Sequence, residues 1–576
     1  MKNRASSHLL ALLLIIGFEI VGYYAVHRAA LIRGYETSWI MAIRDLLMFV
    51  PIIFLVFLLT RALKFAGNWT LFTTAILLFS IGMLVQYRLY SDPEFNKNRL
   101  SEKAAAREQK TEKLRIRYIN ENYDAEKKEI MGLEATPAKP LELEEAPTVK
   151  TSYTINNALL SGSTWIPILA FASFALALGL CVRDSFLLLL QRYSFIIVVL
   201  TLVPLAIAVA TSRFGKALGN MTPWEPSKIP FLIGFAGILT ARYRDLARTY
   251  WGIPRARDIV PLIVMAILPF IPFFVLKDFG QMLVFGGAYA TLYLVAVRRW
   301  PQLLLFVGSV VLVAGVLVVG ALPVEVQEKV PLLPTLARPV KAALPDRIQQ
   351  RFHLWIDGFN PPDPEVRWWK KDYEEALDND EAQARIEGRP SKRQEMATMS
   401  ETAKRAVNVD VWFDSVALQP AQATFGLAAG RTTGRGLGLG FAEVVPIADS
   451  DYIYAAIGEE MGLAGGAIII LALIIFVWAG VRTAIDARDM FTKLCSAGLT
   501  AFIGFQALVN IGGVTRALPM TGITLPFVSH GGFSLITSFA MLGMLMAFSH
   551  RNARDARSAV RQKRRAHDPS IPEAVQ

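Results

Sequence analysis

The stretch DYIYAAIGEEMGLAGGAIIILALIIFVWAGV, residues 451–481, decides the fold of this chain. It begins with acidic and aromatic residues and continues into an apolar run of about 20 residues, the length that crosses a bilayer as a helix. Similar runs recur on both sides of it, so we predict an all-α integral membrane protein, a polytopic bundle of about twelve transmembrane helices. The predicted spans are approximately residues 8–27, 45–63, 70–90, 163–182, 193–211, 229–246, 258–276, 279–297, 302–322, 452–480, 494–514 and 532–549.

The composition of the 576 residues agrees with a membrane protein, because 53% are hydrophobic and only 19% are charged. These values exclude an ordinary cytosolic enzyme, a small disulfide scaffold and a disordered protein. Cys181 and Cys495 both lie in apolar runs, so no disulfide framework is expected. The net charge of +12 is explained first by membrane topology, and no nucleic-acid partner is expected.

Lysine and arginine are concentrated in one set of short loops, which the positive-inside rule places in the cytoplasm. With twelve spans this predicts a multi-pass protein with both termini cytoplasmic. The basic tail, residues 551–576, lies on the same face and is either a topology signal or a site for anionic membrane lipids. Five basic residues are exceptions on the opposite face: Arg28, Arg33, Arg44, Arg213 and Lys216.

Two charged segments interrupt the spans, and this topology places both on the outer face. Each is either a solvated spacer or a docking segment for a partner. The chain therefore divides into an N-terminal two-helix extension, a first core helix, a charged insert, a group of core helices, a large outer loop, a C-terminal group of core helices and a basic tail. In the same order, these are residues 1–69, 70–91, 92–160, 161–322, 323–450, 451–550 and 551–576.

Several kinds of chemistry are missing from the sequence. The six histidines make no metal-ligand spacing with each other or with cysteine. There is no phosphate-binding glycine-rich loop with Lys and Ser or Thr, so transport driven by ATP has no motor in this chain. GLGLG at 436–440 does not follow a buried strand, and no nucleotide, haem or flavin is expected.

Ionisable residues and helix breakers gather near the end of the chain. We expect residues 430–440 to form a flexible outer loop, and Asp451 and Ser450 lie where the next span begins. Those two side chains could simply cap the helix. Glu459 and Glu460 lie about two turns inside the span and could lie at the membrane interface or pair with a cation in the bundle. Because charge in a membrane is costly, we expect at least one of them to have a structural or functional partner.

These motifs resemble the SEDS family (shape, elongation, division and sporulation), typified by FtsW, RodA and SpoVE. The resemblance rests first on VPIADSDYIYAAIGEEMGL (445–463), in which Asp451 takes the place of the family's catalytic aspartate. PMTGITLPFVSHGG (519–532) and QATFGLAAGRTTGRG (422–436) are similar to two further family signatures. Shorter matches are WEPSK (224–228), KDFGQ (277–281) and RFHLWIDGFNP (351–361).

Some positions depart from the family pattern. Asp449 replaces a histidine, so a second carboxylate enters the region of Asp451. Lys228 stands where a glutamate is usual, and His530 replaces a tyrosine. A core of ten helices is usual in the family, so the first two helices here look like an extension.

The resemblance implies a bacterial peptidoglycan glycosyltransferase of the cytoplasmic membrane. Such an enzyme polymerises lipid II, the lipid-linked disaccharide-pentapeptide, in elongation or division, with inversion and with undecaprenyl pyrophosphate as the leaving group. It implies a class B penicillin-binding protein as partner, and Mg²⁺ or Mn²⁺ as a candidate cofactor. Asp451 is the implied catalytic base. The implied substrate-binding residues are Gln422, Arg435, Arg516 and Ser529, and Glu459, Glu460 and Asp278 support the site.

Three alternatives remain open at this point. Arg516 could pair with Glu459 or Glu460, or it could bind the pyrophosphate of the substrate through its planar guanidinium. As a whole, the protein could instead be a flippase or transporter of the lipid-linked precursor, for which many spans and buried charges are suited. It could also be a scaffold that anchors cell-wall synthases through its outer segments.

Overall fold

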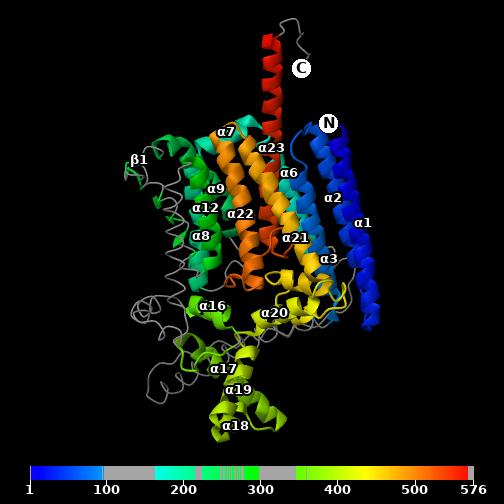
Figure 1. The fold of residues 1–576 in the computed structure, drawn as a ribbon, viewed down its shortest axis with the longest axis vertical. Helices are drawn as coiled ribbons and strands as arrows, with labels where there is room; N and C mark the ends of the chain where they lie inside the picture. Colours follow the sequence, from blue (N-terminus) through cyan, green and yellow to red (C-terminus); the bar gives the residue numbers. More distant parts are fainter. Residues whose placement is uncertain are drawn as a thin grey trace, which may run out of the picture.

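A computed structural model of the chain describes residues 2–93, 95, 162–214, 224–246, 249–250, 278–297, 346–358 and 360–567, with isolated residues between 253 and 273. Both termini lie at one end of a helical bundle, which we call the terminal end, and a group of shorter helices lies at the opposite, distal end (Figure 1). The elements are α1 (Lys2–Ile32), α2 (Trp39–Ala62), α3 (Thr70–Ser91), α6 (Gly162–Cys181), α7 (Asp184–Arg192), α8 (Ser194–Phe214), α9 (Trp224–Leu246), β1 (Thr249–Tyr250), β2 (Ile253–Pro254), α12 (Phe279–Val297), α16 (Asp346–Asp357), α17 (Arg367–Glu387), α18 (Lys392–Thr398), α19 (Glu401–Asp414), α20 (Leu418–Gly430), the 3₁₀ turn η1 (Ala442–Val444), α21 (Ile453–Asp486), α22 (Met490–Val514) and α23 (Gly532–His567).

The all-α polytopic membrane fold is confirmed. Among the described residues, 7 helices are long and apolar enough to cross a membrane, or 8 if α6 and α7, bent by 93°, count as one span. Helices α8 and α9 occupy two more of the predicted spans. Their described residues are not both long enough and apolar enough to be counted among these membrane-crossing helices. The predicted span at 302–322 lies outside the described residues, and that at 258–276 is described only at isolated positions. The two-residue strands β1 and β2 pair antiparallel beside the bundle.

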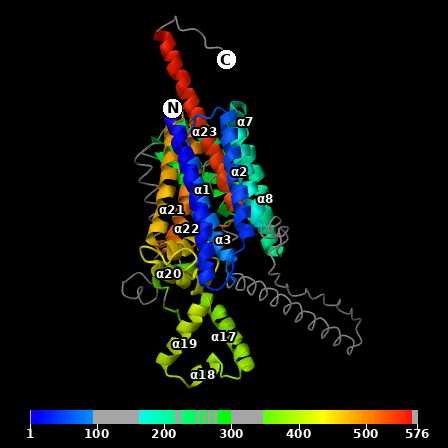
Figure 2. The same ribbon diagram turned by 90° about the vertical axis from the view of Figure 1, so that its right-hand side faces the viewer.

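Helices α3, α22 and α23 form the centre of the bundle. In the most apolar 18-residue stretch of each helix, 72% of the residues of α3, 72% of those of α22 and 78% of those of α23 are buried. The corresponding share is 33% in both α1 and α2. Figure 1 shows α1 and α2 along one side of the bundle, and Figure 2 faces that side, as expected for an extension of a core. Their exposed apolar residues suit a surface that faces lipid.

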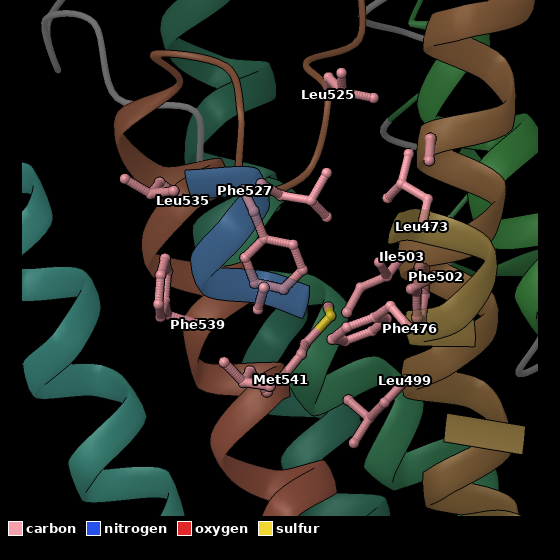
Figure 3. Close-up of a cluster of buried hydrophobic side chains, with 14 of the residues drawn as sticks. Leu473, Phe476, Leu499, Phe502, Ile503, Leu525, Phe527, Leu535, Phe539 and Met541 are labelled. Carbon is pink, nitrogen blue, oxygen red and sulfur yellow. The ribbon is translucent and has the colours of Figure 1, made fainter. Parts of the chain in front are cut away.

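The segment between α22 and α23 folds back into the bundle and is held there by an aromatic cluster. Phe527 lies between Phe476 of α21 and Phe539 of α23, with ring centroids 5.4 and 5.5 Å apart (Figure 3). Phe527 adopts φ +65°, a left-handed conformation that is unfavourable for a bulky residue and persists because packing imposes it. This anchor fixes the residues around it, which reach the site described below.

Within the predicted outer segment 323–450, the described part from residue 346 onward is largely helical. Helices α17, α18 and α19 form a small unit with its own core, in which Trp369 and Trp412 are fully buried. The two rings contact edge to face at 5.3 Å between centroids. The unit projects from the distal end of the bundle (Figures 1 and 2). The insert at 92–160 lies outside the described residues except for its first few positions.

Residues 431–440 form a loop between α20 and η1, as the sequence suggested, and its backbone is hydrogen-bonded to a break in α21. Helix α21 is broken at Gly462, which has φ 65° and ψ −166°. The break frees the carbonyls of Glu459 and Glu460, and these accept hydrogen bonds from the backbone N–H groups of Arg435 and Gly436 at 3.0 and 2.9 Å. Non-helical backbone of this kind in a membrane helix is tolerated because neighbouring protein satisfies its polar groups.

The same loop also satisfies the other side of the break. The N–H groups of Leu463 and Ala464 donate to the carbonyls of Arg431 and Thr432 at 2.9 and 3.2 Å. The two chains approach so closely that a Cβ on Gly462 would lie 2.2 Å from the backbone nitrogen of Gly434. The loop and the broken helix are therefore one structural unit.

We predict that Gly462→Ala destabilises the protein strongly, by about 3 kcal/mol, because the new Cβ meets backbone and the conformation is one that glycine favours. Gly17→Ala is the matched control, since Gly17 lies within α1 and no atom approaches its Cβ position within 4 Å. Thermal melting of both variants in detergent tests the prediction. Equal melting midpoints for the two variants would show that the contact with the loop is not structural.

Candidate functional site

A cavity of about 950 Å³ opens at the distal end of the bundle, where segments from across the chain converge. Its polar side comes from the segment before α21, from the ends of α9 and α12, and from the segment before α23. Its apolar side comes from α6 and the first turn of α23. The lining residues that carry the argument are Glu225, Asp278, Gln281, Glu443, Asp449 and Asp451 on the polar side, and Ile166, Leu169, Ile447, Phe533 and Ile536 on the apolar side.

Asp451 is a half-buried member of this lining and does not cap α21. That helix starts at Ile453 with Tyr452 as its N-cap residue and with no hydrogen bond from a side chain, so the capping alternative for Asp451 and Ser450 is wrong. Burial, together with the negative charges of Asp449 and Asp278, raises the pKa of Asp451 to about 6. At neutral pH the group is thus a carboxylate of unusually high basicity.

Arg351 of α16 is the cation whose charge acts on the Asp451 carboxylate. Its positive charge and a hydrogen bond from Ser450 partly offset the rise in the pKa of Asp451. Nη1 of Arg351 donates to the carbonyl of Thr521 at 2.8 Å, and its side chain lines a small neighbouring cavity and not the cavity of Asp451. Burial lowers the pKa of Arg351, while the negative charges of Asp278 and Asp451 raise it.

Gly522 separates the two side chains and leaves the space between them open. It has φ +72°, and a Cβ placed there would lie 3.4 Å from Oδ2 of Asp451 and 3.6 Å from Nη2 of Arg351. Arg351 was not among the predicted site residues. The signal that pointed to it was RFHLWIDGFNP, the segment that resembles a family stretch beginning with arginine.

Two buried polar side chains, one from α22 and one from the segment after it, hold the backbone around Asp451. Nδ2 of Asn510 donates to the carbonyl of Asp451 at 2.9 Å and to that of Ile523 at 2.5 Å. Oγ of Ser529 donates to the carbonyl of Ser450 at 2.6 Å and accepts from the N–H of Leu525 at 2.8 Å. Ser529 is only 3% exposed, so its hydroxyl supports the loop and does not line the cavity as a substrate-binding group.

Asp449, the second carboxylate, is tied to α3. Its Oδ2 accepts a hydrogen bond from the hydroxyl of Tyr90 at 2.7 Å, and its carbonyl accepts from the N–H of His530 at 2.9 Å. The ring of His530 contacts Gln86 through Nδ1 at 3.1 Å. Asp449 therefore connects the segment before α21 to α3.

The floor of the cavity is a buried polar network around Lys228. Its Nζ lies 2.7 Å from Oε2 of Glu225 and donates to Oε1 of Gln506 at 2.8 Å. Gln281 donates from Nε2 to the other oxygen of Glu225 at 3.2 Å, and its N–H contacts Asp278 at 3.3 Å. The lysine that departs from the family pattern thus has a carboxylate partner three residues away. Burial raises the pKa of Asp278, which the N–H of Gln281 partly offsets.

A buried ion cluster lies behind the cavity wall. Arg88 of α3 is 0% exposed and contacts three carboxylates: Glu460 at 2.5 Å, Glu443 at 2.7 Å and Asp92 at 3.0 Å. Arg33, which follows α1, reaches Glu443 and Asp92 from the N-terminal extension. Glu460 also accepts from the N–H of Gly438, and Glu459 accepts from the N–H of Phe441. Both glutamates are therefore structural ties between α21 and residues 438–443.

The remaining predicted substrate-binding residues lie away from the cavity lining. Gln422 lies in α20, and Arg435 is exposed with its guanidinium 5.5 Å from the ring centroid of Phe441. Arg516 donates to the carbonyls of Leu354 and Trp355 at 3.2 and 3.3 Å. It therefore ties α22 to the end of α16, and its predicted pairing with Glu459 or Glu460 is wrong because those carboxylates bind elsewhere.

The described residues contain no group of three or more His, Cys, Asp or Glu side chains that could hold a metal ion. An all-protein metal site is therefore not formed by this part of the chain. Asp278 and Asp451 nevertheless line one cavity. One or two carboxylates together with substrate phosphates are the usual ligands of Mg²⁺.

Comparison with known proteins finds similarity to named cell-wall proteins. Residues 403–554 match the family model of FtsW, RodA and SpoVE, described as "Cell cycle protein". The chain is 28% identical over 349 residues to "Peptidoglycan glycosyltransferase RodA" of Mycobacterium tuberculosis (strain ATCC 25618 / H37Rv), which is 60% of this chain and 58% of that protein. It is 36% identical over 133 residues to "Stage V sporulation protein E" of Bacillus subtilis (strain 168), 23% of this chain and 36% of that protein. The alignment therefore spans little more than half the length of the Mycobacterium tuberculosis relative.

Solved structures resemble the chain more distantly. "Crystal structure of Thermus thermophilus Rod shape determining protein RodA" aligns with a TM-score of 0.37 and 14% identity, over 84% of this chain and 97% of that one. A chain from "Structural coordination of polymerization and crosslinking by a peptidoglycan synthase complex" aligns with a TM-score of 0.44 and 17% identity, over 69% of this chain and 93% of that one.

We predict that Arg88→Gln costs about 3–5 kcal/mol, because it leaves buried carboxylates without their cation. Arg33→Gln should cost about 1 kcal/mol, since its side chain is 21% exposed and Arg88 remains in place. The control is Arg28→Gln, because Arg28 is an exposed residue of α1, the helix that ends just before Arg33. The melting midpoint in detergent should drop most for the Arg88 variant, less for the Arg33 variant and least for the Arg28 variant. Any other order contradicts the view that Arg88 is the main contributor to the stability of the ion cluster.

Proposed function

We propose that this chain, a member of the FtsW/RodA/SpoVE family through residues 403–554, is a peptidoglycan glycosyltransferase of a bacterial cytoplasmic membrane. It polymerises lipid II into glycan strands in elongation or division. The observation that carries the proposal is Asp451, a carboxylate of raised pKa in a cavity that has a polar side and an apolar side. The relatives are named as glycosyltransferases, which favours polymerisation over the transport of a precursor.

Asp451 is the general base of the proposed reaction. Its carboxylate takes the proton of the acceptor sugar hydroxyl while that oxygen attacks the anomeric carbon of the donor. The bond from the anomeric carbon to the phosphate oxygen breaks, and the diphosphate leaves with the electron pair. A single displacement inverts the configuration at carbon. Because a diphosphate leaves as an anion, no second carboxyl group is needed as an acid, unlike in glycoside hydrolysis.

Arg351 supplies the positive charge that the leaving diphosphate requires. It lies across Gly522 from Asp451 and outside the lining of the cavity, so a diphosphate bound over Gly522 would contact both groups. A guanidinium binds phosphate through two parallel hydrogen bonds, and its charge stabilises the developing anion. Arg516 then acts indirectly, because its bonds to Leu354 and Trp355 hold the helix that carries Arg351.

The apolar side of the cavity suits the polyprenyl tail of the donor. Ile166 and Leu169 of α6 line it, and Leu169 is 51% exposed on a helix whose surface faces the bilayer. A lipid tail can therefore lie in the membrane while its headgroup reaches Asp451. On the polar side, Oε1 of Gln281 is buried and has no hydrogen-bond partner among the described residues, so it can accept from a sugar hydroxyl or amide.

A divalent cation, Mg²⁺ or Mn²⁺, would be held by Asp278 and Asp451 together with diphosphate oxygens, and when bound it would supply further positive charge to the leaving group. The chain's own residues account for proton transfer and orientation without it. Activity after chelation and after adding each metal back measures this requirement.

A class B penicillin-binding protein is the proposed partner, because the reaction makes strands that another enzyme must cross-link. The unit of α17–α19 projects beyond the bundle at the end that carries the cavity, so it is placed to contact a domain outside the membrane (Figures 1 and 2). The terminal end, with both termini, is then cytoplasmic, as its basic residues favour. Mild-detergent co-purification with and without residues 367–414 tests the contact.

We predict that Asp451→Asn lowers glycan polymerisation by about 100- to 10,000-fold, the usual contribution of a general base. Expression and melting midpoint should stay close to those of the wild type, because Asn510 holds the backbone of residue 451 and not its side chain. Incubation of the purified protein with lipid II, followed by gel analysis of the polymer, measures the effect. Polymer at the wild-type rate from this variant would rule out Asp451 as the base.

The pH profile provides a second prediction. A base with a pKa of about 6 gives a rate that falls below pH 6, by about tenfold per pH unit. Asp449→Asn removes a negative charge that raises this pKa, so the acid limb should move to lower pH. Arg351→Gln removes a positive charge that lowers it, so the limb should move to higher pH. Shifts in the same direction for both variants would contradict the assignment.

A further inference from the structure

A second cavity of about 850 Å³ lies at the terminal end of the bundle, and the proposed reaction does not use it. It forms where α1, the turn between α2 and α3, the end of α21 and the last part of α23 meet. Its lining combines residues from the N-terminal extension and from the core. The lining side chains that could contact a ligand through polar, charged or aromatic groups are His8, Asn68, Trp69, Trp478, Arg482, Asp486, Arg488 and Asn552.

The charged groups of this lining favour an anion. Two arginines, Arg482 and Arg488, and a single carboxylate, that of Asp486, line it, and His8 adds a neutral imidazole. Nε of Arg482 lies 4.0 Å from Oδ2 of Asp486, and the two side chains are 62% and 57% exposed. A pair that is so long and so exposed binds weakly, so Arg482 keeps most of its capacity for another anion.

The wall of the cavity is fixed, as a binding site requires. The turn before α3 is bonded to α23: the N–H of Ala66 donates to Nδ1 of His550 at 2.9 Å, and the N–H of Asn68 donates to Oγ of Ser549 at 2.6 Å. The ring of Phe65 stacks on that of His550 at 5.4 Å. On the other side, Nδ2 of Asn552 donates to the carbonyl of Thr483 at 2.8 Å, which joins α23 to α21.

Two tryptophans place the cavity at the depth of lipid headgroups. Trp478 is 56% exposed on α21, and the guanidinium of Arg482 lies 5.6 Å from its ring centroid. Trp69 lines the same cavity at the start of α3. Tryptophan is enriched at membrane–water interfaces, and arginine beside it reaches the phosphate level. The cavity is thus accessible from the bilayer as well as from water.

We propose that this cavity binds the phosphate group of an anionic phospholipid in the same leaflet as the chain termini. Arg482 and Arg488 bind the phosphate, Asn68 and Asn552 lie within reach of the rest of the headgroup, and Trp478 contacts the upper acyl chain. The bound lipid joins α1 and the turn after α2 to the core helices. The inference does not depend on the proposed reaction, because the two cavities lie at opposite ends of the bundle.

The test uses the full chain in detergent with phosphatidylglycerol as the probe. The lipid should raise the melting midpoint of the wild type and remain bound in native mass spectrometry. The double variant Arg482→Gln/Arg488→Gln should retain about 30-fold less lipid, since each basic side chain near an anionic surface contributes about 1 kcal/mol. Both arginines are exposed, so the variant is expected to fold.

The matched control is Arg61→Gln/Arg192→Gln, which removes two exposed arginines at the same end but outside the cavity. It should retain the lipid like the wild type. Equal loss in both double variants, or no loss in either, overturns the site. Stabilisation by inorganic phosphate alone, lost only with Arg482 and Arg488, supports the phosphate site but overturns the lipid as its source.

Discussion

The fully buried guanidinium of Arg88 is the constraint on which the distal half of the structure depends. A charge inside a membrane protein is costly unless it is paired, and Arg88 is paired with Asp92 just after α3, with Glu460 of α21 and with Glu443 in the segment before α21. These contacts connect residues as far apart in the chain as 372 positions. They fix Glu443, and Glu443 begins the segment 443–451, which contributes Asp449 and Asp451 to the cavity.

The chemistry of Asp451 follows from how rigidly that segment is held. Its backbone is bound by Asn510 and Ser529, so its carboxyl group is left for the cavity and not used to cap a helix. Burial and two neighbouring carboxylates then raise its pKa, while Arg351 limits the rise. The same features, raised basicity and a cation across a glycine, suit proton transfer next to a leaving diphosphate.

The two-helix N-terminal extension is part of this arrangement at both ends. Distally, Arg33 shares the carboxylates of Arg88, and at the terminal end the turn at 65–68 is bonded to α23. Its outer surface is apolar and exposed, because only 33% of the residues in the most apolar stretch of α1 and of α2 are buried. The extension therefore faces lipid on one side and reinforces the core on the other.

The sequence by itself determined the membrane class, most of the spans and the family motifs, because apolar length and short patterns are properties of local sequence. It also singled out Asp451, since the motif around it is contiguous. Only the tertiary structure decided the rest: that Ser529 supports a loop, that Arg516 binds the end of α16, and that Arg351 is the cation beside Asp451. It also decided that residues 430–440 complete a broken helix. Such roles depend on which distant backbone and side-chain groups meet, and in a medium without water each polar group must find its partner there.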